Sequence, residues 1–262
     1  MPPSLREAEG ISIVLPARDE VANIVAAVER SLAVAQQLAS RYEVIVVDDG
    51  SSDGTGQAVE ALAKQHPNVR LVSHPANQGY GAALRTGFAQ ARFELVFFTD
   101  SDNQFDVAEL ENFMPLMANY DLVAGFRINR DDPVIRFVYS WFYNRFVGIL
   151  FGLRVRDVNC AFKLMRRQVA EQITIECNNF FVNTELLAKA RRGDFRIAEV
   201  GVHHYPRTAG QTTVRLSDIP RTMGTALTMW RRIHFPEPVT TNRPGVQDSP
   251  VSAVSEFQPA HH

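Results

Sequence analysis

The sequence predicts an α/β fold with a mostly parallel sheet that is covered by helices on both faces. Short apolar runs alternate with segments of helical periodicity along the first half of the chain. Such alternation is typical of parallel strands joined by right-handed crossovers. Acidic residues follow several of the apolar runs directly. Because ligands of such sheets bind beyond the carboxyl ends of the strands, we expect a ligand site on that rim.

Five apolar runs in the first half are predicted strands, and a helix is predicted after each of the first four. The strands are residues 11–16, 42–47, 69–72, 95–99 and 121–125, and the helices begin near residues 19, 54, 80 and 107, the last ending near 117. Pro16 ends the first run, and Asp19 has the position expected for a helix N-cap. Six acids follow strand ends, and we expect no basic partners for them, which favours a metal or nucleotide site: Asp19, Glu20, Asp48, Asp49, Asp100 and Asp102.

The second half of the chain has a different composition, with an aromatic-rich segment of helical period near its start. Its predicted elements are a helix at 134–153, a polar loop at 154–159, strands at 161–165 and 195–200, a helix at 183–192 and an amphipathic helix at 217–235. Residues 1–9 are predicted to be flexible. Residues 236–262 are rich in proline and polar residues and are predicted to be a disordered tail. The remainder, 10–235, is predicted to be a single domain.

Composition narrows the class of protein. Of 262 residues, 45% are hydrophobic and 21% charged, as in soluble globular proteins, and a net charge of −2 gives no reason to expect nucleic acid as a partner. Cys160 and Cys177 fit neither a metal site nor a disulfide framework, which favours a reducing compartment. We expect no secretory signal in residues 1–10. The segment 134–153 carries Arg136, Asn144 and Arg145 and is predicted not to span a membrane.

Two carboxylates one residue apart follow the fourth predicted strand. Asp100 and Asp102 would repel each other unless a cation or hydrogen-bond donors neutralise them. Mg²⁺ or Mn²⁺ binds one or two carboxylates and completes its coordination with water and substrate phosphates. An isolated acidic pair of this kind is more often a turn that caps a strand. Its place in a series of strands, several of which end in acids, favours the metal site.

A pair of glycines, Gly79 and Gly81, resembles part of a dinucleotide-binding motif. The third glycine of that motif is absent, and the pair follows the third predicted strand of the chain, not the first. We therefore expect these glycines to allow a close backbone approach at the start of a helix.

Six motifs occur in the order seen in family-2 glycosyltransferases, and the chain resembles the branch that contains dolichol-phosphate mannose synthase and the polyprenyl-phosphate glycosyltransferases. The resemblance covers roughly residues 10–216. The motifs are Pro16-Ala17-Arg18-Asp19-Glu20, Val47-Asp48-Asp49-Gly50-Ser51-Ser52-Asp53-Gly54-Thr55, Asn77-x-Gly79-x-Gly81, Asp100-Ser101-Asp102-x-Gln104, Gly125-Phe126-Arg127 and Pro206-Arg207-x-x-Gly210-x-Thr212.

The resemblance implies a GT-A fold, with a Rossmann-like nucleotide-sugar half at 10–127 and an acceptor half at 128–216. It also implies roles for matching residues. The base and ribose pocket would be lined by Pro16, Arg18, Glu20, Val47 and Asp49. The metal that bridges the donor diphosphate, Mg²⁺ or Mn²⁺, would be held by Asp100, Asp102 and Gln104, with Ser101 beside it. Arg127 and Arg207 would face phosphate oxygens of donor or acceptor.

Three departures from the family pattern concern the choice of substrate. Asp19 stands where the family usually has asparagine, and Thr213 where it commonly has lysine, so either Arg215 substitutes or a phosphate contact is lost. The segment 157–163 also differs from the usual threonine-serine-glycine loop. Donor or acceptor is therefore expected to differ from those of the mannose synthases.

The resemblance predicts a metal-dependent, inverting transfer of a hexose from GDP-mannose or UDP-glucose to a polyprenyl or dolichyl phosphate. An ionised phosphate acceptor needs no general base. A sugar or protein hydroxyl, the alternative acceptor, would need one, and Asp157 is the candidate. A non-catalytic nucleotide-sugar-binding subunit is the alternative from another class. Processive polysaccharide synthesis is disfavoured because no Gln-x-x-Arg-Trp motif is present.

The helices at 134–153 and 217–235 combine apolar and aromatic residues with arginines, as interfacial helices do, although packing on the core would explain the pattern as well. Many relatives carry transmembrane helices after the catalytic domain. We expect this chain to act as a cytoplasmic protein, peripheral at the cytoplasmic face of the membrane. A membrane-protein partner and a homo-oligomer both stay open.

Overall fold

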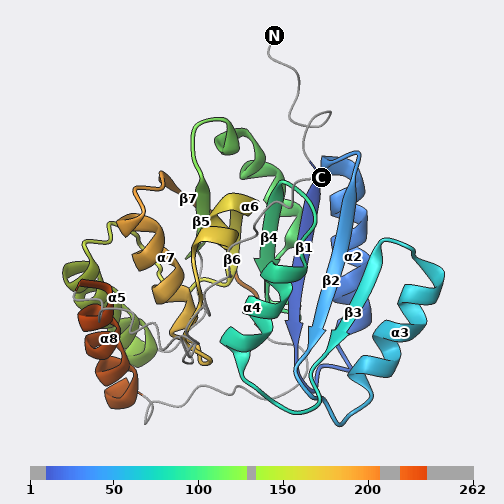
Figure 1. The fold of residues 1–262 in the computed structure, drawn as a ribbon, viewed down its shortest axis with the longest axis horizontal. Coiled ribbons are helices and arrows are strands. Elements are labelled where there is room, and N and C mark those ends of the chain that lie inside the picture. The colour runs from blue at the N-terminus through green and yellow to red at the C-terminus, as the bar shows by residue number, and fades with distance from the viewer. Residues whose placement is uncertain (1–9, 129–133, 207–218, 235–262) are drawn as a thin grey trace, which may run out of the picture.

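The computed structural model describes residues 10–128, 134–206 and 219–234 (Figure 1). In these ranges seven strands form one sheet, in the order β3-β2-β1-β4-β6-β5-β7. Among them β6 runs antiparallel to its neighbours β4 and β5, and the other strands share one direction. The strands are β1 (Ile11–Ala17), β2 (Tyr42–Asp48), β3 (Val69–Ser73), β4 (Leu95–Thr99), β5 (Leu122–Ile128), β6 (Phe162–Arg166) and β7 (Ile197–His203).

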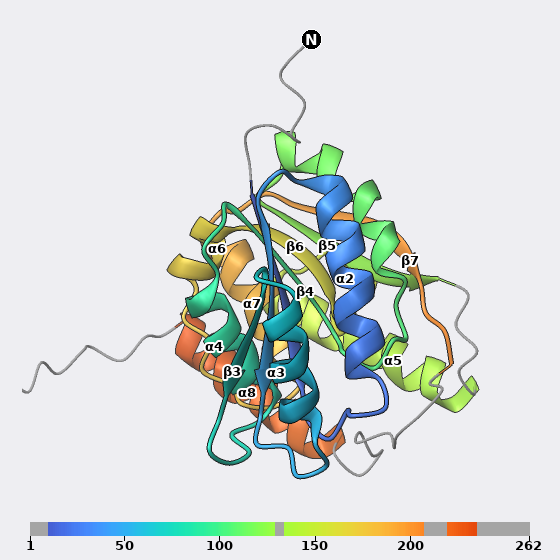
Figure 2. The same ribbon diagram turned by 90° about the vertical axis from the view of Figure 1, so that its right-hand side faces the viewer.

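Helices cover both faces of the sheet (Figures 1 and 2). The chain builds outward from β1 through β2 to β3, so right-handed crossovers put α2 and α3 on one face. The return to β4 on the other side of β1 puts α4 on the opposite face. The helices are α2 (Ile24–Leu38), α3 (Thr55–Gln65), α4 (Tyr80–Gln90), α5 (Val134–Phe151), α6 (Arg167–Gln172), α7 (Val182–Arg192) and α8 (Ile219–His234), with short 3₁₀ segments η1 (Val107–Asn112) and η2 (Met114–Ala118).

The predicted α/β class with a mostly parallel sheet is confirmed, and every predicted strand is present. Two predicted details of the helices are wrong. Asp19 is not an N-cap, because α2 begins five residues later, after Asn23. The helix predicted from 107 to 117 consists of η1 and η2, because Pro115, at the start of η2, lacks the N–H that a continuous α-helix would need there.

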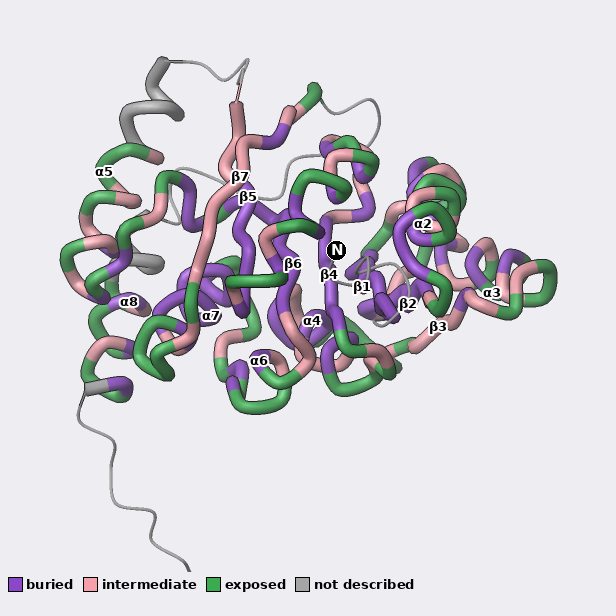
Figure 3. The backbone as a smooth tube through the Cα atoms, turned by 90° about the horizontal axis from the view of Figure 1, so that it is seen from above, coloured by how far each residue is buried: buried purple, intermediate pink, exposed green. Residues whose placement is uncertain are grey.

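The core lies on both faces of β4, whose residues are buried throughout (Figure 3). Successive side chains of a strand point to opposite faces. Phe97 therefore packs against Phe162, with the ring centroids 4.6 Å apart, whereas Phe98 packs against Phe88 of α4 at 5.5 Å. Because both faces of β4 are filled with large apolar side chains, the end of this strand is a rigid base for the acids that follow it.

No helix within the described ranges combines the length and the apolar character that crossing a membrane requires. Helices α5 and α8 lie side by side at one end of the molecule, beyond α7 (Figure 1). The expectations for residues 1–9 and 236–262 fall outside the described residues. So does the start of the predicted amphipathic helix, which the structure describes from Ile219.

Candidate functional site

Asp100 and Asp102 lie at the carboxyl end of β4, next to the end of β1. The order of the strands reverses between β1 and β4, which is where open α/β sheets bind ligands. Asp100 Oδ1 accepts a hydrogen bond of 2.8 Å from the Tyr80 hydroxyl, and Asp102 Oδ1 accepts one of 3.1 Å from the Gln104 backbone N–H. The buried Ser101 hydroxyl donates to the Pro16 carbonyl at 2.9 Å. The acidic turn is thereby held against β1.

The electrostatics of this turn favour a cation. Burial is the main cause that raises the pKa of Asp100 to about 7, and the negative charge of Asp102 is the second. Burial and the charge of Asp100 also raise the pKa of Tyr80 well above its usual range, so Tyr80 stays a neutral donor. A hard divalent cation between two adjacent carboxylates would offset the repulsion that raises the pKa of Asp100.

The residues present fit a metal that is shared with a ligand. Within the ranges that the structure covers, no three side chains of His, Cys, Asp or Glu come together as a metal site. A cation at Asp100 and Asp102 would therefore take its other ligands from water and from a bound diphosphate, which is the usual coordination of Mg²⁺. The side-chain amide of Gln104 donates to the Tyr205 carbonyl at 3.0 Å and thus links this turn to the end of β7.

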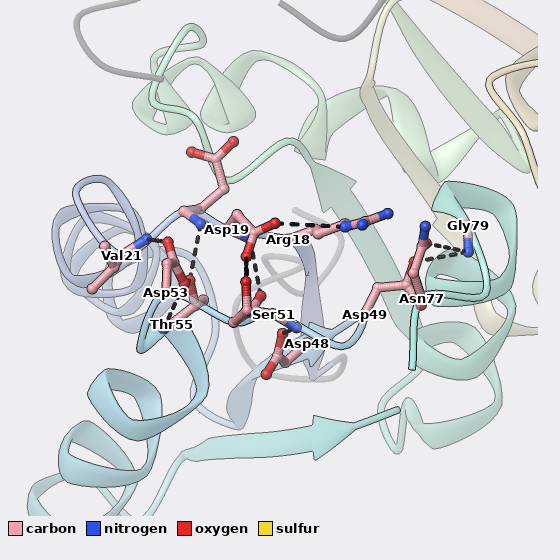
Figure 4. Close-up of polar contacts among 12 residues, drawn as sticks. Arg18, Asp19, Val21, Asp48, Asp49, Ser51, Asp53, Thr55, Asn77 and Gly79 are labelled. Atoms are coloured by element: carbon pink, nitrogen blue, oxygen red, sulfur yellow. Dashed lines mark hydrogen bonds and ion pairs between the residues drawn. The ribbon is translucent and has the colours of Figure 1, made fainter. Parts of the chain in front are cut away.

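The loops after β1 and β2 are cross-linked by short hydrogen bonds (Figure 4). The Asp19 carboxylate accepts from the Ser52 backbone N–H at 2.9 Å, and the Asp19 backbone N–H donates to the Ser51 hydroxyl at 2.9 Å. Asp53 accepts from the Val21 backbone N–H at 3.0 Å. Burial raises the pKa of Asp53, but hydrogen bonds from the Thr55 hydroxyl and from the backbone N–H groups of Val21 and Thr55 outweigh it, so that the pKa is lowered overall.

Two predicted pocket residues are held on the same rim. The Glu20 backbone N–H donates to the Thr55 hydroxyl at 2.9 Å, and the Glu20 carboxylate accepts from the Asn23 side chain at 2.6 Å. The Arg18 side chain is half exposed, and its Nε lies 3.7 Å from the Asp19 carboxylate. The Arg18 guanidinium therefore reaches solvent beside the rim, where a ligand could meet it.

Asp49 is buried and accepts three hydrogen bonds. His74 Nδ1 lies 2.7 Å from Asp49 Oδ1, and the backbone N–H groups of Gln78 and Gly79 donate to the carboxylate at 2.8 Å each. The expectation that the acids of this rim lack basic partners is therefore wrong at Asp49. Its carboxylate fixes the turn that leads into α4.

The polar loop before β6 also carries an acid with a basic partner. Arg127 donates to Asp157 through both Nε, at 2.6 Å, and Nη2, at 3.0 Å, and Asp157 is buried. The two residues were expected to have separate roles, Arg127 toward phosphate and Asp157 as the alternative base. The structure brings them together as a forked ion pair, so Asp157 would act as a base only after leaving Arg127.

Gly79 and Gly81 allow the close approach predicted for them. A Cβ on Gly81 would lie 1.9 Å from the Cys177 carbonyl oxygen, and one on Gly79 would lie 2.3 Å from that of Asn178. The Gly81 backbone N–H donates to Asn178 O at 3.0 Å. The start of α4 is thus pressed against the loop that precedes α7.

Three residues near Asp100 had no assigned role in the sequence analysis: Tyr80, Lys163 and Asn183. Lys163 is fully buried in β6 and donates to Asn183 Oδ1 at 2.9 Å. A lysine inside a predicted buried strand was the available signal, whereas nothing local marks Tyr80 or Asn183. Arg207, Thr212, Thr213 and Arg215 lie outside the described residues.

Comparison with known sequences relates residues 12–177 to the family model described as Glycosyl transferase family 2. An undecaprenyl-phosphate 4-deoxy-4-formamido-L-arabinose transferase of Shewanella sediminis is 31% identical over 207 residues, which cover 77% of this chain and 61% of that protein. Glycosyltransferase AglD of Haloferax volcanii is 32% identical over 216 residues, covering 79% of this chain and 34% of that protein. The chain thus spans between one third and two thirds of these relatives' lengths.

Comparison with solved structures finds glucosyl-3-phosphoglycerate synthase of Mycobacterium tuberculosis, in complex with Mn²⁺, UDP and glucosyl-3-phosphoglycerate. The TM-score is 0.67 at 20% identity, covering 86% of this chain and 80% of that one. At this identity the likeness concerns the fold.

Proposed function

This chain belongs to glycosyl transferase family 2 and has a GT-A fold, and from that premise we propose that it transfers a hexose from a nucleotide sugar to a polyprenyl phosphate. The observation that carries the proposal is the position of the carboxylate pair Asp100 and Asp102, which follows β4 at the point where the strand order reverses. The name of the Shewanella sediminis relative, which contains undecaprenyl-phosphate, supports a lipid phosphate as acceptor. We propose GDP-mannose or UDP-glucose as donor.

The donor would bind along the rim formed by the ends of β1 and β2. Pro16, Arg18, Glu20, Val47 and Asp49 would line the base and ribose pocket. Arg18 reaches solvent at this rim, which suits contact with a ligand, while Asp49 keeps the turn into α4 in place behind it. The cross-linked loops after β1 and β2 would keep this pocket rigid when the donor is absent.

Asp100 and Asp102, with Gln104 nearby, would hold the metal that the donor diphosphate shares. A bound Mg²⁺ or Mn²⁺ supplies Lewis acidity at the departing diphosphate. Ser101 would keep the turn against β1 through its bond to the Pro16 carbonyl. Arg127 and Arg207 would complete the positive surroundings of the phosphates. Arg127 is steered by Asp157, which fixes the direction of its guanidinium.

The transfer itself is a direct displacement. An ionised oxygen of the acceptor phosphate attacks the anomeric carbon and forms the new C–O bond with its lone pair. The bond from that carbon to the β-phosphate oxygen breaks, and its electron pair leaves with the nucleoside diphosphate. Phosphate monoesters lose their second proton near pH 6, so no base has to remove one. The pairing of Asp157 with Arg127 agrees with a reaction that uses no such base. Attack opposite to the leaving group inverts the anomeric carbon.

The acceptor would be met at a membrane surface, by the end of the molecule that α5 and α8 form. Within the described part of α5, Trp141, Phe142 and Ile149 are exposed by 56%, 60% and 70%, and Arg145 is exposed among them. On α8, Leu227 is exposed next to the exposed pair Arg231 and Arg232. Exposed aromatic residues mixed with arginines suit an interfacial helix on anionic lipid. We propose that the protein is peripheral at the cytoplasmic face.

The test is release of nucleoside diphosphate from a panel of nucleotide sugars, with Mn²⁺ or Mg²⁺ and a short polyprenyl phosphate. We expect turnover with one donor, its loss in EDTA, and a product of inverted configuration by NMR. Asp102→Asn should abolish turnover with little change in the melting temperature of the metal-free protein.

Three other outcomes would contradict the proposal. Turnover that requires a saccharide or protein hydroxyl would assign a different acceptor. A product of retained configuration would exclude the direct displacement. Tight nucleotide-sugar binding without turnover on any acceptor would identify a non-catalytic binding subunit.

A further inference from the structure

A lysine is buried beneath the candidate metal-binding turn. Lys163 of β6 is 0% exposed and pairs in register with Phe98 of β4, over whose ring its ammonium lies 5.6 Å from the centroid. The ammonium donates to Asn183 Oδ1 at 2.9 Å, to the Val158 carbonyl at 3.3 Å and to the Cys160 carbonyl. Three acceptors match its three N–H groups. The ammonium is therefore fully hydrogen-bonded but shielded from solvent, and it lies on the sheet between the two halves of the protein.

The hydrogen bonds continue from Lys163 to Asp100. Tyr80 Oη lies 2.8 Å from Asp100 Oδ1, and Asn183, 3% exposed at the start of α7, is close enough to the Tyr80 hydroxyl to lower its pKa as a hydrogen-bonding neighbour. The direction of each bond follows from the two ends. An ammonium only donates, so Asn183 turns its carbonyl oxygen to Lys163 and its amide N–H to Tyr80. The phenol oxygen accepts from Asn183, and the phenol donates its single hydroxyl proton to Asp100.

Four parts of the fold therefore meet in one directed series of hydrogen bonds, which begins at an ammonium donor and ends at a carboxylate acceptor. β6 contributes the cation, α7 the amide, α4 the phenol, and the turn after β4 the carboxylate. Hydrogen bonds arranged head to tail polarise one another in a medium of low dielectric constant. This series of hydrogen bonds holds Oδ1 of Asp100 in place and thereby restricts where the other carboxylate oxygen, Oδ2, can lie.

We propose that Tyr80, Asn183 and Lys163 are positioning residues that hold Asp100 ready for the metal shared with the donor diphosphate. The inference rests on the proposed function. Residues that hydrogen-bond a metal ligand orient it and tune its affinity, and their loss typically weakens metal binding by about 10-fold to 100-fold. None of the three would touch the metal or the sugar. They act through Asp100.

A purely structural role is the alternative, and it applies to Lys163 above all. Its hydrogen bonds to the carbonyls of Val158 and Cys160 hold the loop before β6. Removing the lysine would therefore disturb the fold as well as the series of hydrogen bonds to Asp100. Tyr80→Phe is the cleaner variant. It deletes one hydroxyl and keeps the ring, which stacks on Phe180 with the centroids 5.4 Å apart.

The protein also contains a tyrosine that can serve as a matched control. The Tyr143 hydroxyl makes a hydrogen bond of 2.8 Å to Thr184 Oγ1, in the packing between α5 and α7. Tyr143→Phe therefore deletes an equivalent phenolic hydrogen bond without touching Asp100. A change that reflects only a lost buried hydroxyl would appear in both variants, whereas a change due to the positioning chain would appear in Tyr80→Phe.

The experiment is a titration of the full chain with Mn²⁺ alone, followed by the EPR signal of the free ion, together with the melting temperature in EDTA. We expect Tyr80→Phe to weaken Mn²⁺ binding by about 10-fold, and Tyr143→Phe to bind Mn²⁺ like the wild type. Both variants should melt at similar temperatures. Asn183→Asp should weaken binding too, because its carboxylate still accepts from Lys163 but takes the Tyr80 proton away from Asp100. That variant serves if Tyr80→Phe does not fold.

Wild-type Mn²⁺ affinity in Tyr80→Phe and Asn183→Asp would overturn the inference, provided that Asp102→Asn has lost affinity. Equal weakening in Tyr80→Phe and Tyr143→Phe would overturn it as well, since the effect would then be general. If Asp102→Asn binds Mn²⁺ like the wild type, the metal site of the proposed function fails, and the positioning chain with it. The Asp102 variant thus separates failure of the inference from failure of the function.

Discussion

Asp19 has a left-handed backbone, with a φ of 52°, in the turn between β1 and α2. Asp and Asn adopt this conformation more readily than other residues that carry a Cβ. The Asp19 carboxylate accepts from the backbone N–H and the hydroxyl of Ser52, at 2.9 and 3.3 Å. The carbonyl oxygen of an asparagine can accept the same bonds. The departure from the family's usual asparagine is therefore a conservative one, whereas the ion pair with the half-exposed Arg18 contributes little.

At this residue we predict that Asp19→Asn changes the free energy of unfolding by less than about 0.5 kcal/mol, because backbone and acceptor are both preserved. Asp19→Ala should lower it by about 2 kcal/mol, from roughly 1 kcal/mol of left-handed strain and roughly 1 kcal/mol for the lost hydrogen bonds. Urea unfolding followed by circular dichroism measures both. An alanine variant as stable as the wild type would show that this turn relaxes freely.

At the scale of elements, the start of α4 joins the two halves of the molecule. Gly81 contacts the backbone of the loop before α7, and that loop is anchored in turn by a buried carboxylate. Glu185 of α7 accepts from the backbone N–H groups of Glu176 and Cys177, at 2.8 and 2.9 Å, and from Lys189 at 2.7 Å. A helix, a loop and a second helix are thereby fixed around Tyr80. The geometry at Asp100 depends on this contact.

We predict that Gly81→Ala destabilises the fold by about 1–3 kcal/mol or more, because the new methyl group meets a backbone carbonyl, which cannot move aside as a side chain can. Turnover should fall as well, since Tyr80 precedes the shifted residue. Gly224→Ala in α8 is the control. Nothing lies within 4 Å of its added Cβ, and a helical Gly→Ala change stabilises by roughly 0.5–1 kcal/mol. Thermal unfolding of the two variants in opposite directions is the expected result.

At the scale of the whole molecule, the rim that carries the acids and the exposed face of α5 lie at different parts of the same α/β structure, which is built on one continuous sheet. The rim is formed by the ends of β1, β2 and β4, and α5 and α8 lie beyond the opposite edge strand β7 (Figure 1). The proposed protein would thus carry its donor site and its lipid-facing helices on one rigid frame. Membrane attachment then belongs to the molecule as a whole, and not to the site.

We predict that the protein floats with vesicles containing anionic phosphatidylglycerol, and that the double variant Trp141→Ser and Phe142→Ser binds at least about tenfold more weakly. The loss reflects two large apolar side chains that no longer enter the lipid, at roughly 25 cal/mol for each Å² of apolar surface. Val25→Ser, on α2, removes another exposed apolar side chain elsewhere on the surface and should float like the wild type. Flotation that is unchanged in the double variant would exclude α5 as the contact.

The prediction succeeded where the signal was local. The apolar run that forms β4 and the acids that follow it could be recognised, because residues adjacent in the sequence determine strand periodicity and strand ends. It failed at Asp49, whose partner His74 is 25 positions away, and it did not foresee that Arg127 pairs with Asp157, 30 positions away. Which charges meet depends on the packing of distant elements. Pro115 was a local signal that the helical periodicity obscured.

By itself, the sequence determined the class of fold and the rim on which the acids lie, because alternating strands and helices bring strand ends to one side of a parallel sheet. Only the tertiary structure decided the strand order, including the antiparallel β6 between β4 and β5, because an apolar run reads the same in either direction. That insertion carries Lys163 into register with Phe98. It thereby places the buried cation from which the hydrogen bonds to Asp100 begin.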